Sequence, residues 1–214
     1  MKDSMKSRAL LPLSILALGF LQGCPAPLYQ MNRLPESSPL PEPAPIAADA
    51  DYVHAPSRSA FPLVVGSFRR VALTRYDTGG LDVSAGYNAG APDCPVRLTV
   101  YVSPAPRMSF IGANPSVVQA LETRWLQSKY QDWKREIEGA HPQASLIQEG
   151  AQDQDGAPGR QAVYAIDADQ SELHVRLVDR TWFVTYRRSF PSACAAQART
   201  LTDGFLASWP ARGA

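Results

Sequence analysis

The residue with the most distinctive chemical setting is Cys24, one of three cysteines in the chain. It follows a basic start with Lys2, Lys6 and Arg8 and an almost unbroken apolar run over 9–21. A run of about 13 residues is shorter than the roughly 20 that a membrane-spanning helix needs, but it suits a signal-peptide core. We therefore expect residues 1–23 to direct export. The thiolate of Cys24 is a nucleophile that could then be modified covalently.

The segment Leu21-Gln22-Gly23-Cys24 resembles a lipobox, the modification motif of bacterial lipoproteins. That motif has a branched apolar residue three positions before an obligatory cysteine and a small residue directly before it, as Leu21 and Gly23 are here. The resemblance implies cleavage after Gly23, a diacylglyceryl group on the Cys24 thiol and usually an acylated amino group. Two or three acyl chains would hold the protein on a membrane, whereas a single chain holds only weakly. The alternatives are an ordinary signal peptide with an incidental cysteine, or a buried helix.

Pro25 follows the lipobox cysteine, where an aspartate tends to retain proteobacterial lipoproteins in the inner membrane. The resemblance therefore implies a cell-envelope location, lipid-anchored in the outer membrane and facing the periplasm.

The other two cysteines, Cys94 and Cys194, suit a disulfide, because disulfides form in exported compartments. Cys94 precedes a predicted strand, and Cys194 opens the last predicted helix. The two would be adjacent if that helix packs beside the preceding hairpin. Closing a loop of about 100 residues stabilises by up to about 4–5 kcal/mol in the chain-entropy model. The alternative is two unpaired thiols.

No residue pattern predicts catalysis or a metal site. His54, His141 and His174 lie far apart and lack metal-ligand spacing, so each is expected to be solvated. The chain has no Gly-x-Ser-x-Gly nucleophile elbow and no phosphate-binding glycine loop. The sequence therefore predicts neither an enzyme nor a cofactor, although a serine triad assembled in space stays open.

Arginines recur on the predicted strands. Because side chains alternate along a strand, Arg97 and Arg176 are each expected on the face of their strand that does not carry its apolar residues. Arg187 lies near the end of another strand. These three residues could form a basic patch on one sheet face, suited to an anionic partner such as lipid headgroups or cell-wall polymer. The alternative is a solvated face balanced by carboxylates. The formal net charge of +1 does not favour nucleic acid, which usually needs a strongly basic surface.

Prolines are frequent in residues 24–60, most densely between Pro39 and Pro45. Alternating prolines prevent the hydrogen bonding of helices and sheets, so this segment is predicted to be a disordered, extended tether behind the lipidated cysteine. A tether would hold the folded domain away from the membrane. The alternative is a ligand for a proline-recognising partner or for the cell wall.

Residues 61–214 are predicted to form the globular domain. Asn114 and Pro115 begin a helix with a broad apolar stripe, which Gly139 and Pro142 end, and a last helix starts near Pro191. Alternating apolar residues and turn signals predict strands at 68–76, 81–87, 96–102, 144–149, 161–166, 173–178 and 182–190. Short connections favour antiparallel pairing. We expect an α+β fold with a single antiparallel sheet of about six to seven strands packed with two α-helices.

The order of three strands, a helix, four strands and a helix, with Tyr186-Arg187 near the end of the last strand, is similar to that of PsbP-like domains of photosystem and bacterial envelope proteins. The resemblance implies an α/β sandwich and a mostly non-catalytic role. We expect a membrane-anchored envelope lipoprotein with a non-catalytic domain that binds another envelope protein or a cell-wall component, or that supports an assembly. The alternatives are a small-molecule or lipid binder and, less favoured, an envelope hydrolase.

Overall fold

The computed structural model describes residues 37–107, 112–152 and 157–208. Gly23, Cys24 and the first part of the predicted tether lie outside the described residues.

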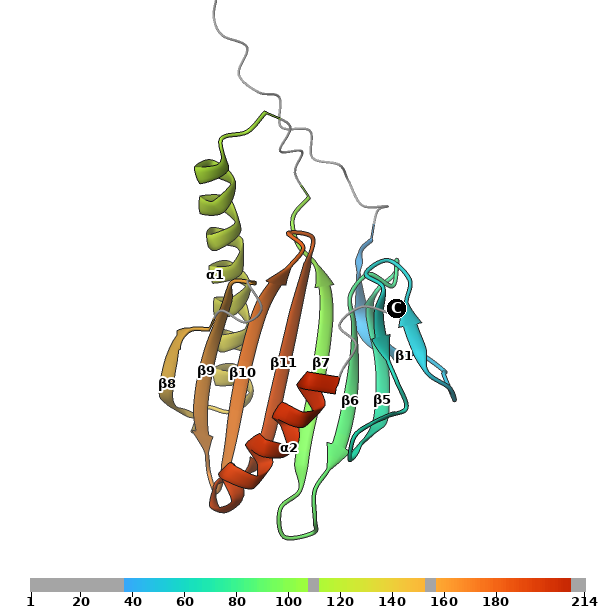
Figure 1. The fold of residues 1–214 in the computed structure, drawn as a ribbon, viewed down its shortest axis with the longest axis vertical. Helices are drawn as coiled ribbons and strands as arrows, with labels where there is room; N and C mark the ends of the chain where they lie inside the picture. The colour runs from blue at the N-terminus through green and yellow to red at the C-terminus, as the bar shows by residue number, and fades with distance from the viewer. Residues whose placement is uncertain (1–36, 108–111, 153–156, 209–214) are drawn as a thin grey trace, which may run out of the picture.

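The domain is built on one antiparallel sheet (Figure 1). Eight strands run in the spatial order β1-β5-β6-β7-β11-β10-β9-β8, and the short β4 also pairs with β5. Their bounds are Pro39–Pro45 for β1, Val64–Val65 for β4, Phe68–Asp77 for β5, Val83–Ala89 for β6, Val96–Pro104 for β7, Ser145–Ala151 for β8, Gly159–Ile166 for β9, Asp169–Val178 for β10 and Trp182–Pro191 for β11. A separate hairpin joins β2 (Tyr52–His54) to β3 (Ser59–Phe61).

The α+β class, the single large antiparallel sheet and the two helices agree with the sequence analysis, and each of the seven predicted strands has a counterpart. The expected count of six to seven strands is too low. The sheet has nine strands, because β1 and β4 also join it.

The prediction of a disordered tether as far as Ala60 is wrong from Pro39 onward. The proline-rich segment forms β1, in which Pro39 lies opposite Asp77 and Pro45 opposite Thr74 on β5. An edge strand pairs on one side only, so residues without an N–H can be accommodated there. The following residues are fixed by Arg70, which donates to the carbonyl oxygens of Ala48 (2.8 Å) and Ala50 (2.7 Å). The ordered domain therefore begins well before residue 61.

Helix α1 spans Pro115–Ala140 and confirms the predicted helix. The side chain of Asn114 accepts a hydrogen bond from the backbone N–H of Ser116 at 2.9 Å, which satisfies one of the free donors of the first turn. At the other end, the N–H of His141 donates to the carbonyl of Ile137 at 2.9 Å. Among the described residues, no helix is long and apolar enough to cross a membrane.

The two helices cover opposite faces of the sheet. Helix α1 packs over β9 and β10, and its buried side chains contact Tyr164, Leu173 and Val175. Helix α2 (Ala195–Ser208), which follows a 3-10 turn at Ser192–Cys194, packs over β5, β6, β7 and β11. Phe205 is the centre of that second core and lies edge-on to Phe68 and Tyr87. In Figure 1, α2 crosses the sheet in front of β7 and β11, while α1 lies along β8 to β10.

Candidate functional site

The three arginines of the predicted basic patch do not share a face of the sheet. Arg97 lies opposite Ser189, and Arg187 opposite Thr99, in the β7–β11 register, so both arginines are on the α1 face. Arg176 lies opposite Val184, which belongs to the core under α2. The reason is that β7 buries its apolar residues beneath α2, whereas β10 buries its own beneath α1. Solvent-side positions of the two strands therefore point in opposite directions, and a single patch of all three arginines is ruled out.

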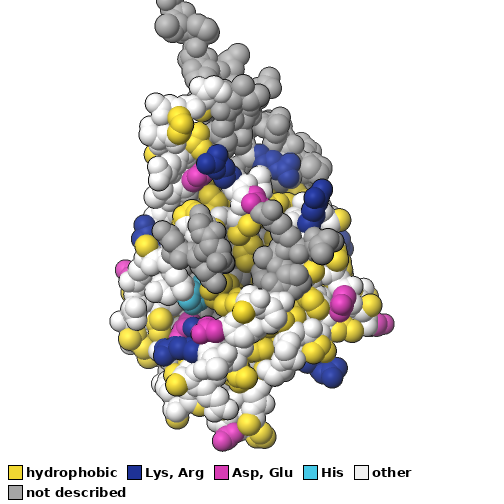
Figure 2. All heavy atoms as spheres, viewed as in Figure 1, with side chains coloured by type: hydrophobic (Ala, Val, Ile, Leu, Met, Phe, Trp, Pro, Cys, Tyr) yellow, Lys and Arg dark blue, Asp and Glu magenta, His cyan; other side chains and the backbone are white. Residues whose placement is uncertain are grey.

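Among the described residues visible on the α2 face, Figure 2 shows no concentrated basic surface. Lysine and arginine side chains are scattered over this face, and several lie next to aspartate or glutamate side chains. On the other face of the sheet, which α1 covers, Arg97 and Arg187 lie together.

Arg97 and Arg187 line a hollow of about 310 Å³ on the α1 face, which we call the polar recess. It lies where β7, β11 and β10 meet the end of α1. Its principal polar residues are Arg97, His141, Asp169, Ser171, Arg187 and Ser189. The two guanidinium groups and the hydroxyl groups of the polar recess can donate hydrogen bonds. Asp169 is the one carboxylate among these six residues.

Arg187 is held in place inside the polar recess. Its Nε donates to the hydroxyl of Ser171 at 2.9 Å, and its Nη2 donates to Nε2 of His141 at 3.2 Å. Because a guanidinium can only donate, Nε2 of His141 accepts this hydrogen bond. Arg187 is half-buried, so its charge acts in a less solvated environment than that of a surface arginine.

Arg97 is more loosely held at the rim of the polar recess. Its Nη2 lies 3.5 Å from a carboxylate oxygen of Asp169, and the two side chains are 70% and 41% exposed. Exposed ion pairs of this kind contribute little to stability. Arg97 can therefore exchange Asp169 for another anion at small cost.

Serine and histidine side chains meet in the polar recess without forming a nucleophile–base pair. Ser189 donates to Ser171 at 3.3 Å, and Ser171 accepts from Arg187. The Nε2 lone pair of His141 is occupied by the same arginine. A nucleophilic hydroxyl needs a base within hydrogen-bond reach, whereas Arg187 separates these groups. The arrangement suits the binding of an anionic group.

A cluster of buried charges lies on the opposite face, beneath α2. Glu172 on β10 accepts hydrogen bonds from Nε of Arg188 (2.6 Å) and Nε of Arg199 (2.7 Å). Arg188 also donates to Thr202 and, at 3.1 Å, to Asp203. Glu172 and Arg188 are only 2% and 6% exposed. We call Glu172, Arg188, Arg199 and Asp203 the ion cluster, and it fixes α2 to the sheet.

His174 is not solvated, contrary to the sequence analysis. It is buried next to the ion cluster, stacks on Tyr186 with ring centroids 4.5 Å apart, and its Nδ1 contacts the side-chain oxygen of Gln152. Burial lowers the pKa of His174, although the nearby Glu172 acts in the opposite direction. Because this pKa lies below 6.5, the ring is neutral at pH 7.

His54 is also buried, although the sequence placed it in a solvated tether. Its Nε2 donates to the carbonyl of Gly80 at 2.7 Å, Nδ1 accepts from the hydroxyl of Ser57 at 2.6 Å, and the ring lies edge-on to Trp182. Burial lowers the pKa of His54, against smaller opposing effects of the Gly80 carbonyl and of Asp77. The neutral ring attaches the N-terminal hairpin to the sheet.

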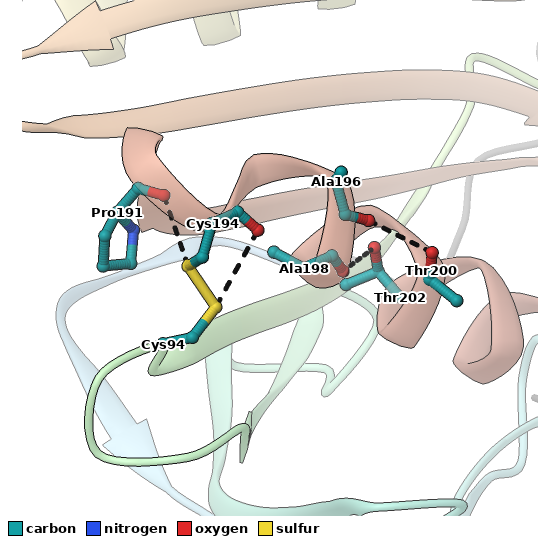
Figure 3. The surroundings of a disulfide bond; sticks show 7 residues. All are labelled: Cys94, Pro191, Cys194, Ala196, Ala198, Thr200 and Thr202. Atoms are coloured by element: carbon teal, nitrogen blue, oxygen red, sulfur yellow. Dashed lines mark hydrogen bonds between the residues drawn. A yellow bond between two sulfur atoms is a disulfide. The ribbon is translucent and has the colours of Figure 1, made fainter.

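Cys94 and Cys194 lie at disulfide distance, as the sequence analysis expected, with their sulfur atoms 2.14 Å apart (Figure 3). The pair joins the loop before β7 to the turn before α2. Cys194 Sγ also lies 3.4 Å from the carbonyl oxygen of Pro191. Gly90 makes the loop conformation possible: its φ is +94°, and a Cβ atom there would lie 2.0 Å from the carbonyl oxygen of Cys94.

Sequence reasoning missed four of the principal polar residues of the polar recess: His141, Asp169, Ser171 and Ser189. The sequence placed His141 only at the end of a helix. The spacing of Arg187 and Ser189, two residues apart on one predicted strand, put both on one face. That spacing was the one available signal, because Ser171 lies before the predicted strand at 173–178, whereas β10 already begins at Asp169.

No protein-family model matches the chain, and no curated protein matches it. Among solved structures, the chain is similar to the solution structure of PsbP (CyanoP) from the cyanobacterium Synechocystis sp. PCC 6803. The identity is 17% and the TM-score is 0.43, with 74% of this chain and 89% of that chain covered. The solved structure is that of a PsbP protein, and the order of predicted helices and strands shows the same resemblance. A similarity with this identity and TM-score says nothing about the function of the present chain.

Proposed function

We propose that this chain is a membrane-anchored lipoprotein of the bacterial envelope, whose domain binds an anionic group of another envelope component without catalysing a reaction. The observation that carries the binding role is the polar recess, in which Arg187 is held by Ser171 and His141 while Arg97 stands at the rim. The anchor rests on the lipobox resemblance of Leu21, Gly23 and Cys24.

The chemistry of the polar recess favours carboxylate or phosphate groups. A guanidinium can bind either group through two parallel hydrogen bonds, and Arg187 is already oriented by its two partners. The space between α1 and strands β9 and β10 is occupied by Leu126, Tyr130 and Ile137. That packing favours an open polar site over a lipid held between helix and sheet.

The anchor is tested by fatty-acid labelling of cells that express the full chain. Cys24→Ala should abolish both labelling and processing, because the acylated thiol is lost. Gln22→Ala is the matched control, since it changes the tolerant position and should leave both unchanged. Labelling of the Cys24→Ala protein at the normal level would refute the anchor.

The binding role is tested with inorganic phosphate as probe, by calorimetric titration of the full-length protein in detergent. Arg187→Gln should weaken phosphate binding about tenfold or more, because a charge-assisted interaction is removed. Arg135→Gln on the exposed side of α1 removes the same charge elsewhere and should change the affinity less than twofold. Equal affinities for wild type and Arg187→Gln would contradict the proposal.

The partner itself is sought by crosslinking in intact cells. A photoreactive residue at position 97, on the rim of the polar recess, should capture an envelope component, and one at position 135 should not. Equal capture at both positions would argue against the polar recess as the docking surface.

A further inference from the structure

A second hollow on the α1 face differs in chemistry from the polar recess. It has a volume of about 210 Å³ and lies between α1 and the part of the sheet formed by β5, β6 and β7. Its walls include three aromatic rings, those of Tyr76, Tyr101 and Trp133. The centroids of Tyr76 and Tyr101 are 6.1 Å apart, and those of Tyr101 and Trp133 are 4.5 Å apart. We call this hollow the aromatic pocket.

Carboxylates outnumber cations in the aromatic pocket. Asp82, Asp132 and Glu136 line it together with a single lysine, Lys129. Asp132 is paired with Arg135 on the same helix. The Lys129 ammonium lies over the rings of Trp133 and Phe183, 5.9 and 6.0 Å from their centroids. The pocket therefore keeps a net negative charge, and one of its rings, that of Trp133, already stands within cation–π distance of an ammonium group.

The carboxylate of Asp82 has no direct partner in the part of the chain that the structure describes. It makes no hydrogen bond and no ion pair there, although it is half-buried. Lys129 attracts it only from a distance. A partly desolvated carboxylate without a bound donor is unfavourable, so a cation that reached Asp82 would be bound with little competition.

Trp133 supplies a second unsatisfied group. The residue is only 9% exposed, and its indole N–H finds no acceptor among the described residues. A buried donor without an acceptor is costly. The indole nitrogen is itself enclosed, so an oxygen atom of a ligand in the pocket would satisfy it after a small shift of the ring.

We propose that the aromatic pocket binds a small organic cation that carries an ammonium group and an oxygen acceptor. The ammonium group contacts Asp82 and the faces of Tyr76 and Tyr101, and the oxygen accepts from the indole N–H of Trp133. This site is separate from the polar recess and does not depend on the proposed anion binding. The two hollows share only Tyr101.

The test uses three probes of similar length: 5-amino-1-pentanol, pentylamine, which lacks the hydroxyl group, and 1-pentanol, which lacks the ammonium group. Binding to the full-length protein in detergent is followed by NMR through the indole N–H resonance of Trp133, which Trp133→Phe identifies among the four tryptophans. The amino alcohol should bind several-fold more tightly than pentylamine and at least tenfold more tightly than pentanol.

Two variants separate the contributions. Asp82→Asn should weaken binding of the amino alcohol at least tenfold, whereas Asp93→Asn, which removes one charge from the exposed loop before Cys94, should change it less than twofold. Trp133→Phe, followed through backbone resonances, should remove the preference for the amino alcohol over pentylamine. Pentanol binding as tightly as the amino alcohol, unchanged binding in Asp82→Asn, or no shift of the Trp133 resonance with any probe would overturn the proposal.

Discussion

The carboxylate of Glu172 on β10 and the guanidinium of Arg188 on β11 form a hydrogen-bonded ion pair beneath α2, with Arg188 Nε 2.6 Å from Glu172 Oε2. Both side chains are almost fully buried. Glu172→Gln would leave the charge of Arg188 buried with only the exposed Asp203 as its counter-ion. Breaking a buried pair in this way costs about 3–5 kcal/mol. We expect a loss of that size in the free energy of unfolding, measured by urea denaturation.

Asp132→Asn provides the comparison for Glu172→Gln, because it breaks an ion pair between Asp132 and Arg135 whose side chains are 55% and 70% exposed. Exposed pairs contribute about 0–1 kcal/mol, so this change should have little effect on stability. Similar losses in the two variants would show that the ion cluster does not stabilise the domain through its burial.

Acid should destabilise the domain through the same glutamate. Burial alone raises the pKa of Glu172, but contacts with His174, Arg188 and Arg199 outweigh it and lower the pKa to about 2. A carboxylate with a lowered folded-state pKa stabilises above its unfolded pKa, and that stabilisation is lost as the pH falls towards the folded value. Between about pH 4.5 and pH 2, the free energy of unfolding should therefore fall by about 3 kcal/mol more in wild type than in Glu172→Gln. Parallel pH curves for the two proteins would contradict this assignment.

The bond between Cys94 and Cys194 closes a loop with a sequence separation of 100 residues. Replacing both cysteines by alanine should lower the free energy of unfolding by up to about 4–5 kcal/mol, because the unfolded chain regains the entropy of the open loop. Urea denaturation of the double variant checks this. Mass spectrometry of the wild type without reductant should find no alkylatable thiol at either position, and free thiols at both would show that the bond is not formed in the protein.

Gly90 offers a test of the loop that presents Cys94. Gly90→Ala would place a Cβ atom 2.0 Å from the Cys94 carbonyl oxygen at a φ of +94°, so the loop must rearrange. A strained backbone of this kind costs about 1–3 kcal/mol, visible as a lower melting temperature. Gly139→Ala in α1 is the matched control: nothing lies within 4 Å of its added Cβ, and a helical alanine should stabilise by about 0.5–1 kcal/mol. Equal effects of the two changes would exclude the proposed strain.

Local signals explain which elements the sequence predicted. Asn114 and Pro115 define the start of α1 by themselves, and alternation within β7 identifies that strand without reference to its neighbours. Proline was misread in β1 because the rule against proline in sheets depends on whether a strand lies at an edge. That position is a property of the whole sheet, which no short window of sequence contains.

Side-chain environments were harder to predict, because they depend on partners distant in the sequence. His54 is buried through a hydrogen bond to Gly80, 26 residues away. Arg176 was assigned to the wrong face because its strand packs beneath α1, while the strand of Arg97 packs beneath α2. Cys94 and Cys194 were the exception, since their pairing was predicted from the small number of cysteines in a chain that we expect to be exported.

The aromatic pocket should bind its cation in a pH-dependent way. Burial raises the pKa of Asp82 to about 6, while Lys129 on α1 opposes the shift and Asp77 on β5 and Glu136 on α1 add to it. An ammonium group binds the ionised carboxylate, so affinity for 5-amino-1-pentanol should rise as the pH increases through about 6, and it should be weaker at pH 5 than at pH 7.5. Asp82→Asn should remove this dependence, because an amide does not titrate in that range. NMR titrations at the two pH values measure both effects, and an equal pH dependence in the variant would show that Asp82 is not the group that titrates.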